Sequence, residues 1–288
     1  MTQSLKTHLE YLLCIKINAV RTVAGGDTSR AYLIATDSER FFCKVNSSMQ
    51  ALPMFRAEQK GLAVLADSKS IAIPKVLFCS TFEAEAFLIM EYIEAQQPNP
   101  LDFERLGQHL AVLHHLEQNS PFGFKTSNFI GSLPQSNTLH EDWTSFYVLE
   151  RLLPQLQMAV DAQKLHPTEV PSENTLIKVC TTLFPTVKPS LLHGDLWSGN
   201  FLISAKGEPY LIDPAVYYGH HEVDLAMTAL FGGFGNRFYE AYHEVVPKED
   251  GAKERCDLYQ LYYLLVHLNL FGTSYKGSVT HILTRYFG

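Results

Sequence analysis

The chain has 288 residues, enough for two lobes around a sizeable core but short for more than two domains. Its composition, with 46% hydrophobic and 18% charged residues, is ordinary for a globular protein. The formal net charge of −7 argues against nucleic acid as the main partner, because binding a phosphate backbone requires a basic face.

The N-terminal sequence and the cysteine spacing predict an intracellular protein without disulfides. No window approaches 18 continuous apolar residues, so no membrane span is expected. The N-terminus carries Lys6, Glu10 and Lys16 among its apolar positions and lacks a signal-peptide core, which predicts a cytoplasmic location. The five cysteines are widely spread without a C-x-x-C pair, so neither a disulfide framework nor a zinc site is expected.

The first third of the sequence reads as an α+β lobe over residues 1–94. A helix is predicted over 4–15 and another over 54–65. Strands are predicted on both sides of the second helix, over 17–23, 30–35, 41–45, 75–79 and 86–93. Polar turns between the first three strands indicate hairpins, so we expect a five-stranded antiparallel sheet.

The Pro-rich segment 95–100 reads as a linker, and residues 101–288 as a mainly helical second lobe. Its helices are predicted over 102–118, 141–163, 172–184, 222–231 and 252–271. A short β-hairpin is predicted from 200–204 and 210–212. A strand-rich lobe, a linker and a helical lobe that holds one hairpin make up the bilobal layout of protein-kinase-like folds.

The most informative segment is His193-Gly194-Asp195-Leu196-Trp197-Ser198-Gly199-Asn200, which fits the H-x-D-x-x-x-x-N pattern of a phosphotransferase catalytic loop. Asp195 is the predicted catalytic base for the attacking hydroxyl. Asn200 and Asp213, at the two ends of the predicted hairpin, are predicted to bind Mg²⁺, a cation that prefers oxygen ligands. The alternative is a set of turn-capping side chains, which are common singly but not in this combination.

Several N-lobe residues fall in the order that nucleotide binding requires. Gly25 and Gly26 could bring backbone N–H groups onto phosphates, or could form only a turn. Lys44 occupies the position of the phosphate-binding strand lysine, with Glu58 on the next helix as its partner. Both could instead be solvated side chains. The end of the last strand should offer backbone groups to adenine, through Met90, Glu91 and Tyr92, although Met90 could be plain core.

Features of regulated protein kinases are missing. No Arg precedes Asp195, the metal-binding aspartate is followed by Pro214 rather than by Phe-Gly, and no Ala-Pro-Glu motif follows. This favours an enzyme for small molecules. The adjacent histidine pairs are unsuited to chelating one ion, and Asp224 is predicted to be a structural carboxylate that binds the backbone of the catalytic loop.

The sequence resembles the fructosamine (ketosamine) kinases, within the aminoglycoside-phosphotransferase-like group. The resemblance rests on the 193–200 loop and on Asp-Pro-Ala-Val-Tyr-Tyr-Gly-His over 213–220. It extends to Asn128-Phe129-Ile130-Gly131, to the run from Pro134 to Arg151, and to 261–272. It therefore covers nearly the whole chain.

The resemblance implies that ATP, with Mg²⁺, phosphorylates the sugar C3 hydroxyl of a ketoamine such as a glycated lysine. The product is unstable and releases the amine, which amounts to deglycation. By position, Asp195 would be the base, Asn200 and Asp213 the metal ligands, Lys44 and Glu58 the nucleotide pair, and Trp197 the residue that packs on the sugar. Some members carry a cysteine directly after the two glycines. Here Asp27 stands there, so a redox switch is not implied.

Two alternatives stay open at the level of sequence. One is a kinase for another amino-bearing alcohol, such as an aminoglycoside or choline. The other is a nucleotide-binding regulator without catalysis, which the presence of Asp195, Asn200 and Asp213 disfavours. The expected partner is a small-molecule ketoamine, and the chain could act as a monomer or a homodimer.

Overall fold

The computed structural model describes residues 1–23, 29–116 and 120–288. Two compact units make up the chain: Met1–Gln97 with Leu202–Ile212, and Pro98–Phe201 with Asp213–Gly288. The lobe bounds expected from the sequence (1–94, 95–100 and 101–288) stay a prediction. Within the described ranges, no helix is both long enough and apolar enough to cross a bilayer.

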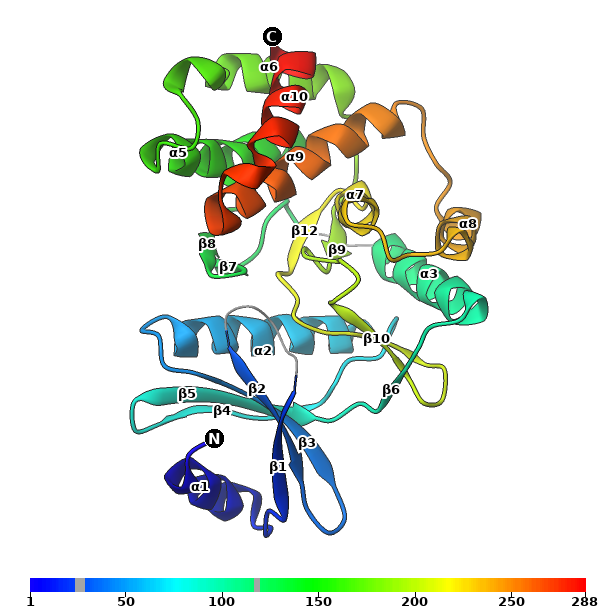
Figure 1. Cartoon of the computed structure of the whole chain (residues 1–288). Coiled ribbons are helices and arrows are strands. Elements are labelled where there is room, and N and C mark those ends of the chain that lie inside the picture. Colours follow the sequence, from blue (N-terminus) through cyan, green and yellow to red (C-terminus); the bar gives the residue numbers. More distant parts are fainter. Residues whose placement is uncertain (24–28, 117–119) are drawn as a thin grey trace. The chain divides into compact units, whose positions relative to one another are not determined.

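The first unit is built on a five-stranded antiparallel sheet, as predicted, with strand order β1-β2-β3-β5-β4. The strands are β1 (Ala19–Val23), β2 (Arg30–Ala35), β3 (Arg40–Asn46), β4 (Val76–Phe82) and β5 (Glu85–Glu91). Helix α1 (Gln3–Leu13) precedes the sheet, and α2 (Ala51–Asp67) connects β3 to β4 (Figure 1).

Each face of this sheet is covered by one helix, and the alternation of side chains along β5 shows why. Phe87 and Ile89 point to the face that packs against Leu5 and Leu9 of α1. Ala86, Leu88 and Met90 point to the opposite face, against Phe55 and Leu62 of α2. Because successive side chains of a strand alternate, an unbroken apolar run on β5 is what a strand buried on both faces requires.

A second, smaller sheet has strand order β11-β10-β6. Its strands are β6 (Ala95–Gln96), β10 (Phe201–Ser204) and β11 (Pro209–Leu211). The β10–β11 hairpin is the one predicted from the sequence. Strand β6 lies inside the segment expected to be only a linker, and it pairs antiparallel with β10 through Gln96 and Ile203.

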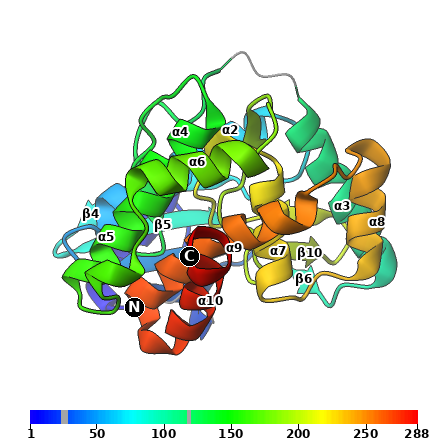
Figure 2. The same ribbon diagram turned by 90° about the horizontal axis from the view of Figure 1, so that it is seen from above.

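The second unit is helical, with its core around α9 (Ala252–Phe271). Apart from a 3-10 turn over Pro167–Glu169 and another over Thr273–Tyr275, its helices are α3 (Pro100–His115), α4 (Trp143–Tyr147), a π-helix (Val148–Leu152), α5 (Leu153–Asp161), α6 (Glu173–Leu183), α7 (Glu222–Leu230), α8 (Asn236–Val245) and α10 (Lys276–Phe287). Seen from above, α3 and α8 run side by side, and α10 packs against α9 (Figure 2).

Helix α3 begins earlier than predicted because Asn99 caps it. The Asn99 side chain accepts hydrogen bonds from Leu101 N and Asp102 N, and Asp102 bonds back to Asn99 N at 3.0 Å. Pro100 fits the first helical position, where no N–H is needed. The proline that suggested a linker therefore starts a helix.

Besides β6, four short strands and the helices α8 and α10 were not predicted. The strands form two antiparallel pairs, the hairpin of β7 (Asn128–Ile130) with β8 (Leu133–Gln135), and β9 (Ser190–Leu192) with the distant β12 (Tyr217–Gly219). The predicted helix over 141–163 is also broken, because five residues adopt a π-helix between α4 and α5. This π-helix carries Arg151, which is fully buried.

Candidate active site

The catalytic loop follows β9, and a buried carboxylate on α7 holds its first turn. Asp224 accepts hydrogen bonds from the backbone N–H groups of His193 (2.8 Å) and Gly194 (2.9 Å). The structural role predicted for Asp224 is therefore confirmed. His114, from α3, lies with its Nε2 3.1 Å from the same carboxylate and its Nδ1 2.8 Å from the Tyr242 hydroxyl.

Gly194 is needed because the segment after Asp213 lies directly against it. A Cβ at position 194 would stand 2.2 Å from the carbonyl oxygen of Ala215, and the residue has φ +83°. Ala215 N in turn donates to the carbonyl of His193 at 2.8 Å. Tyr263 donates from its hydroxyl to the Gly194 carbonyl at 2.9 Å. Only glycine combines this backbone conformation with this contact.

Asp195 and Asn200 are brought together inside the loop. Asn200 Nδ2 donates to the backbone carbonyl of Asp195 at 2.8 Å and reaches its Oδ2 at 3.3 Å. Asn200 is buried and Asp195 is half-buried. The five-residue spacing of the motif is thus the span that closes this hydrogen-bonded ring.

The charge environment separates the two aspartates of the site. Burial, followed by the negative charges of Asp213 and Asp224, raises the pKa of Asp195 to about 7. Burial also acts on Asp224, but the hydrogen bond from His114 and the loop N–H groups outweigh it and lower the Asp224 pKa. One carboxyl is therefore held ionised while the other can exchange a proton near neutral pH.

The residues proposed for magnesium fit a hard cation. With Nδ2 of Asn200 committed to Asp195, its side-chain oxygen is the atom left to act as a ligand. Asp213 lies close enough for its charge to raise the pKa of Asp195. A divalent cation beside these groups would relieve that repulsion, and it would have the oxygen ligands that Mg²⁺ prefers.

In the first unit, the predicted pair of Lys44 and Glu58 is present. Lys44 Nζ lies 2.9 Å from Glu58 Oε1, and the lysine side chain is only 7% exposed. The Glu58 carboxylate fixes the position of the Lys44 ammonium, as the ion pair of a phosphate-binding lysine does. Gly25 and Gly26 lie outside the residues that the structure describes.

The backbone N–H groups at the end of β5 already have partners, and adenine binding there stays a prediction. The Met90 side chain belongs to the core cluster beneath α2. Glu91 N donates to the carbonyl of Lys75 at 2.8 Å, and Tyr92 N to that of Arg40 at 3.4 Å. An adenine ring in this region would therefore have to use other backbone atoms or displace these bonds.

Trp197 is exposed, and its ring lies over the next glycine. The residue is 39% exposed, whereas its neighbours Leu196 and Phe201 are buried. A Cβ on Gly199 would stand 2.3 Å from Cη2 of the indole, so the ring can lie here only because residue 199 is glycine. The indole is thus held on the loop without being part of the core.

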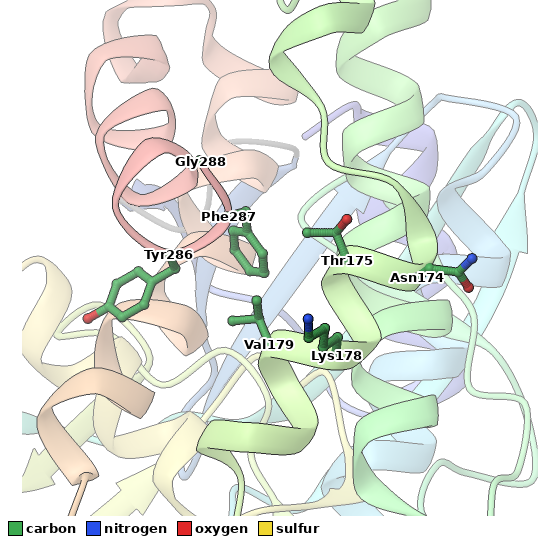
Figure 3. Close-up of a pocket in the computed structure, with 7 residues that line it drawn as sticks. All are labelled: Asn174, Thr175, Lys178, Val179, Tyr286, Phe287 and Gly288. Atoms are coloured by element: carbon green, nitrogen blue, oxygen red, sulfur yellow. The ribbon is translucent and has the colours of Figure 1, made fainter.

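The second unit has two other features that resemble binding sites. His220, His221 and Glu222 cluster closely enough to suggest a metal. However, Glu222 binds Arg255 through both oxygens, at 2.6 and 2.8 Å, so a cation would have to displace a guanidinium. Figure 3 shows a pocket between α6 and the end of α10, lined by Asn174, Thr175, Lys178, Val179, Tyr286, Phe287 and Gly288, which include none of the predicted site residues.

The sequence did not reveal the residues that support the loop from a distance. His114 acts on it through Asp224, 110 positions away along the chain, and Tyr263 contacts Gly194 directly from 69 positions away. Their only signal was an unusual polar residue on an apolar helix face, which is weak without structural context. Gly194 could have been predicted, because a glycine before a catalytic aspartate suggests a close backbone approach.

The fold and the loop define a kinase-like phosphotransferase. A fructosamine kinase family model matches residues 1–287. A probable ketoamine kinase of Synechocystis is 38% identical over 268 residues, which cover 93% of this chain and 90% of that protein. The chloroplastic protein-ribulosamine 3-kinase of Arabidopsis thaliana is 39% identical, covering 94% of this chain and 83% of that one.

Solved structures agree. A crystal structure from Thermobifida fusca, named as a candidate fructosamine-3-kinase, has a TM-score of 0.84 and 32% identity, covering 99% of this chain and 98% of that one. A thermostable mutant of the aminoglycoside phosphotransferase APH(4)-Ia has a TM-score of 0.65 at 17% identity, covering 97% and 98%, which shows the shared fold alone. The chain belongs to the fructosamine kinase family.

Proposed function

We propose that this protein transfers the γ-phosphoryl group of ATP to the C3 hydroxyl of a ketoamine, the type of adduct that a sugar forms with an amine. The observation that carries the proposal is the loop in which Asp195, bonded to Asn200, has a pKa raised to about 7. It is supported by relatives named ketoamine kinase and protein-ribulosamine 3-kinase.

In this reaction Asp195 accepts the proton of the attacking hydroxyl. The hydroxyl oxygen forms a bond to the γ-phosphorus, the bond to the β-phosphate oxygen breaks, and ADP leaves. A base with a pKa near the working pH is effective, because a useful fraction is deprotonated and still binds a proton well.

The remaining residues bind and orient. Asn200 and Asp213 would hold Mg²⁺, which when bound neutralises phosphate charge. Lys44, fixed by Glu58, would bind the α- and β-phosphates. Asp224 keeps the loop backbone in place through His193 and Gly194.

Trp197 is the proposed substrate contact. Its exposed indole can cover the apolar C–H face of a sugar, and a protonated amine near its π-face would add roughly 0.5–2 kcal/mol. An acceptor with both a sugar and an amine suits this residue better than a simple alcohol does.

Phosphorylation at C3 would make the adduct unstable and release the amine, so the proposed role is deglycation. The cytoplasmic location and the monomeric or homodimeric state remain predictions. Plant relatives are named chloroplastic, so location varies among similar proteins.

The division of labour can be tested with two variants. Asp195→Asn should keep the binding of ATP with Mg²⁺ but lower kcat at least ~100-fold, the usual scale for loss of a general base. Asp213→Asn should instead weaken metal and nucleotide binding. Calorimetric titration of AMP-PNP with Mg²⁺, alongside kinetics, separates the two effects. Equal nucleotide affinity and equal loss of activity in both variants would contradict these roles.

A further inference from the structure

Asp213 adopts a backbone conformation that its surroundings must enforce. Its φ is +53°, in the left-handed region that residues other than glycine adopt infrequently. Pro214 follows, and Ala215 N then donates to the His193 carbonyl at 2.8 Å. Whatever fixes the carbonyls of Ala215 and Val216 therefore fixes this turn against the catalytic loop.

Two buried amides from the β7–β8 hairpin hold those carbonyls. Asn128 Nδ2 donates to Val216 O at 2.9 Å, and Gln135 Nε2 lies 3.3 Å from Ala215 O. Gln135 Nε2 also donates to Asn128 Oδ1 at 2.7 Å. Both side chains are at most 7% exposed, so water does not compete for these bonds.

The orientation of each amide is set from further away. Asn128 Oδ1 also accepts from Asn137 Nδ2 at 3.0 Å, and Asn137 Oδ1 accepts from Arg151 Nη2 at 2.6 Å. Gln135 Oε1 accepts from the hydroxyl of Tyr262 on α9. The guanidinium of Arg151 only donates and the Val216 carbonyl only accepts, so the Asn137–Asn128 chain between them has a single satisfied orientation. The Tyr262 hydroxyl could donate or accept, but Gln135 Nε2 is turned to two acceptors, so the hydroxyl donates to Oε1 and stabilises that orientation.

Arg151 is suited to this role because it cannot accept a hydrogen bond and cannot lose its charge. It is fully buried, and its other bonds go to the carbonyls of Ser136 (2.6 Å) and Glu150 (3.0 Å). Among the described residues, no carboxylate forms an ion pair with it. Instead the guanidinium lies 4.0 Å from the ring centroid of Tyr217. Its guanidinium therefore donates to the Asn137 side chain instead of forming a salt bridge.

We propose that Arg151 and Tyr262 are positioning residues for Asp213. They orient the Asn137–Asn128 and Gln135 amides, which hold the Ala215 and Val216 carbonyls and thereby the left-handed turn. The magnesium part of this inference rests on the proposed function, whereas the hold on the turn does not.

Tyr262→Phe is the sharpest test, with Tyr259→Phe as its matched control. Both tyrosines are buried on α9, and each loses one hydrogen-bonding hydroxyl, so similar losses of melting temperature are expected. Tyr259 instead accepts from Trp143 and bonds His220, and it has no hydrogen bond to the amide chain.

Hydrogen exchange is measured on metal-free and nucleotide-free protein, in the peptide that spans 212–219. Tyr262→Phe should speed exchange of the Ala215 amide about tenfold, the effect of losing about 1.4 kcal/mol of protection, while Tyr259→Phe should not. Equal exchange of this amide in the two variants would overturn the inference, whether or not the protein is a kinase.

The affinity of the site for a divalent cation is measured by titrating Mn²⁺ in the presence of AMP-PNP and following the Mn²⁺ EPR signal. Tyr262→Phe should raise the Mn²⁺ dissociation constant about fivefold and lower kcat, with Tyr259→Phe close to wild type. Arg151→Met should behave like Tyr262→Phe, with partial rescue in Arg151→Lys. Faster exchange with unchanged Mn²⁺ affinity and kcat would reject the link to Asp213. Absence of ketoamine turnover in the wild type would reject only the proposed function.

Discussion

The surroundings of Asp195 that suit it to act as a base also destabilise the folded protein when its carboxyl is ionised. Burial raises the pKa of Asp195 in the folded protein to about 7, above its ordinary value of 3.8. A carboxyl with a raised pKa contributes stability that is fully present below its unfolded pKa and is lost as pH rises through about 7.

Asp195→Asn should therefore raise the melting temperature of the metal-free protein more at pH 8 than at pH 5. At pH 8 the wild type carries the unfavourable buried charge, and the variant does not. Thermal unfolding in EDTA at the two pH values measures this difference. A variant whose effect is the same at both values would mean that Asp195 is ionised throughout and that its pKa is not raised.

Trp197 is the residue for which exposure decides between two roles. A core tryptophan would be buried, and this one is 39% exposed above Gly199. Trp197→Ala should lower kcat/KM for ketoamines about tenfold, the loss of roughly 1.4 kcal/mol of contact, and leave ATP affinity and melting temperature nearly unchanged. A fall of many degrees in melting temperature would show that the indole supports the loop instead.

At the scale of elements, local patterns predicted what local interactions determine. The loop over 193–200 was predictable because its ring, from Asp195 to Asn200, closes within five residues. Helix α9 was predicted with its observed bounds because it is long and its C-terminal half, from Leu261 to Phe271, is mostly apolar. The five strands of the first sheet were predicted because each is a run of five to seven residues with several apolar side chains.

The elements that were missed are short or depend on distant partners. Strands β7, β8, β9 and β12 have three residues each, too few for any periodicity to show. In the π-helix, Arg151 contacts Asn137 and the ring of Tyr217. Local sequence propensity does not predict such contacts. In the sequence, Asn128 and Gln135 stand out only through the resemblance to the family. Their side-chain amides contact the carbonyls of residues 215–216, which explains why amide side chains occupy these positions.

For the whole molecule, fold and substrate are separate questions. The same fold appears in an aminoglycoside phosphotransferase at 17% identity, so the fold alone leaves the acceptor open. The net charge of −7 is compatible with acceptors that carry an amine cation, as ketoamines and aminoglycosides both do. The choice between them rests on Trp197 and on the relatives that match across the chain.

The most direct test of the central claim is ATP consumption by the purified protein with Mg²⁺ across a panel of acceptors. Fructosyl-lysine, ribulosyl-lysine and erythrulosyl-lysine are compared with aminoglycosides and choline, and Asp195→Asn serves as the inactive control. We expect turnover with at least one ketoamine, phosphate at its C3 oxygen, and release of free lysine on standing. Turnover of aminoglycosides or choline while every ketoamine stays unphosphorylated would contradict the proposed function and leave only the fold.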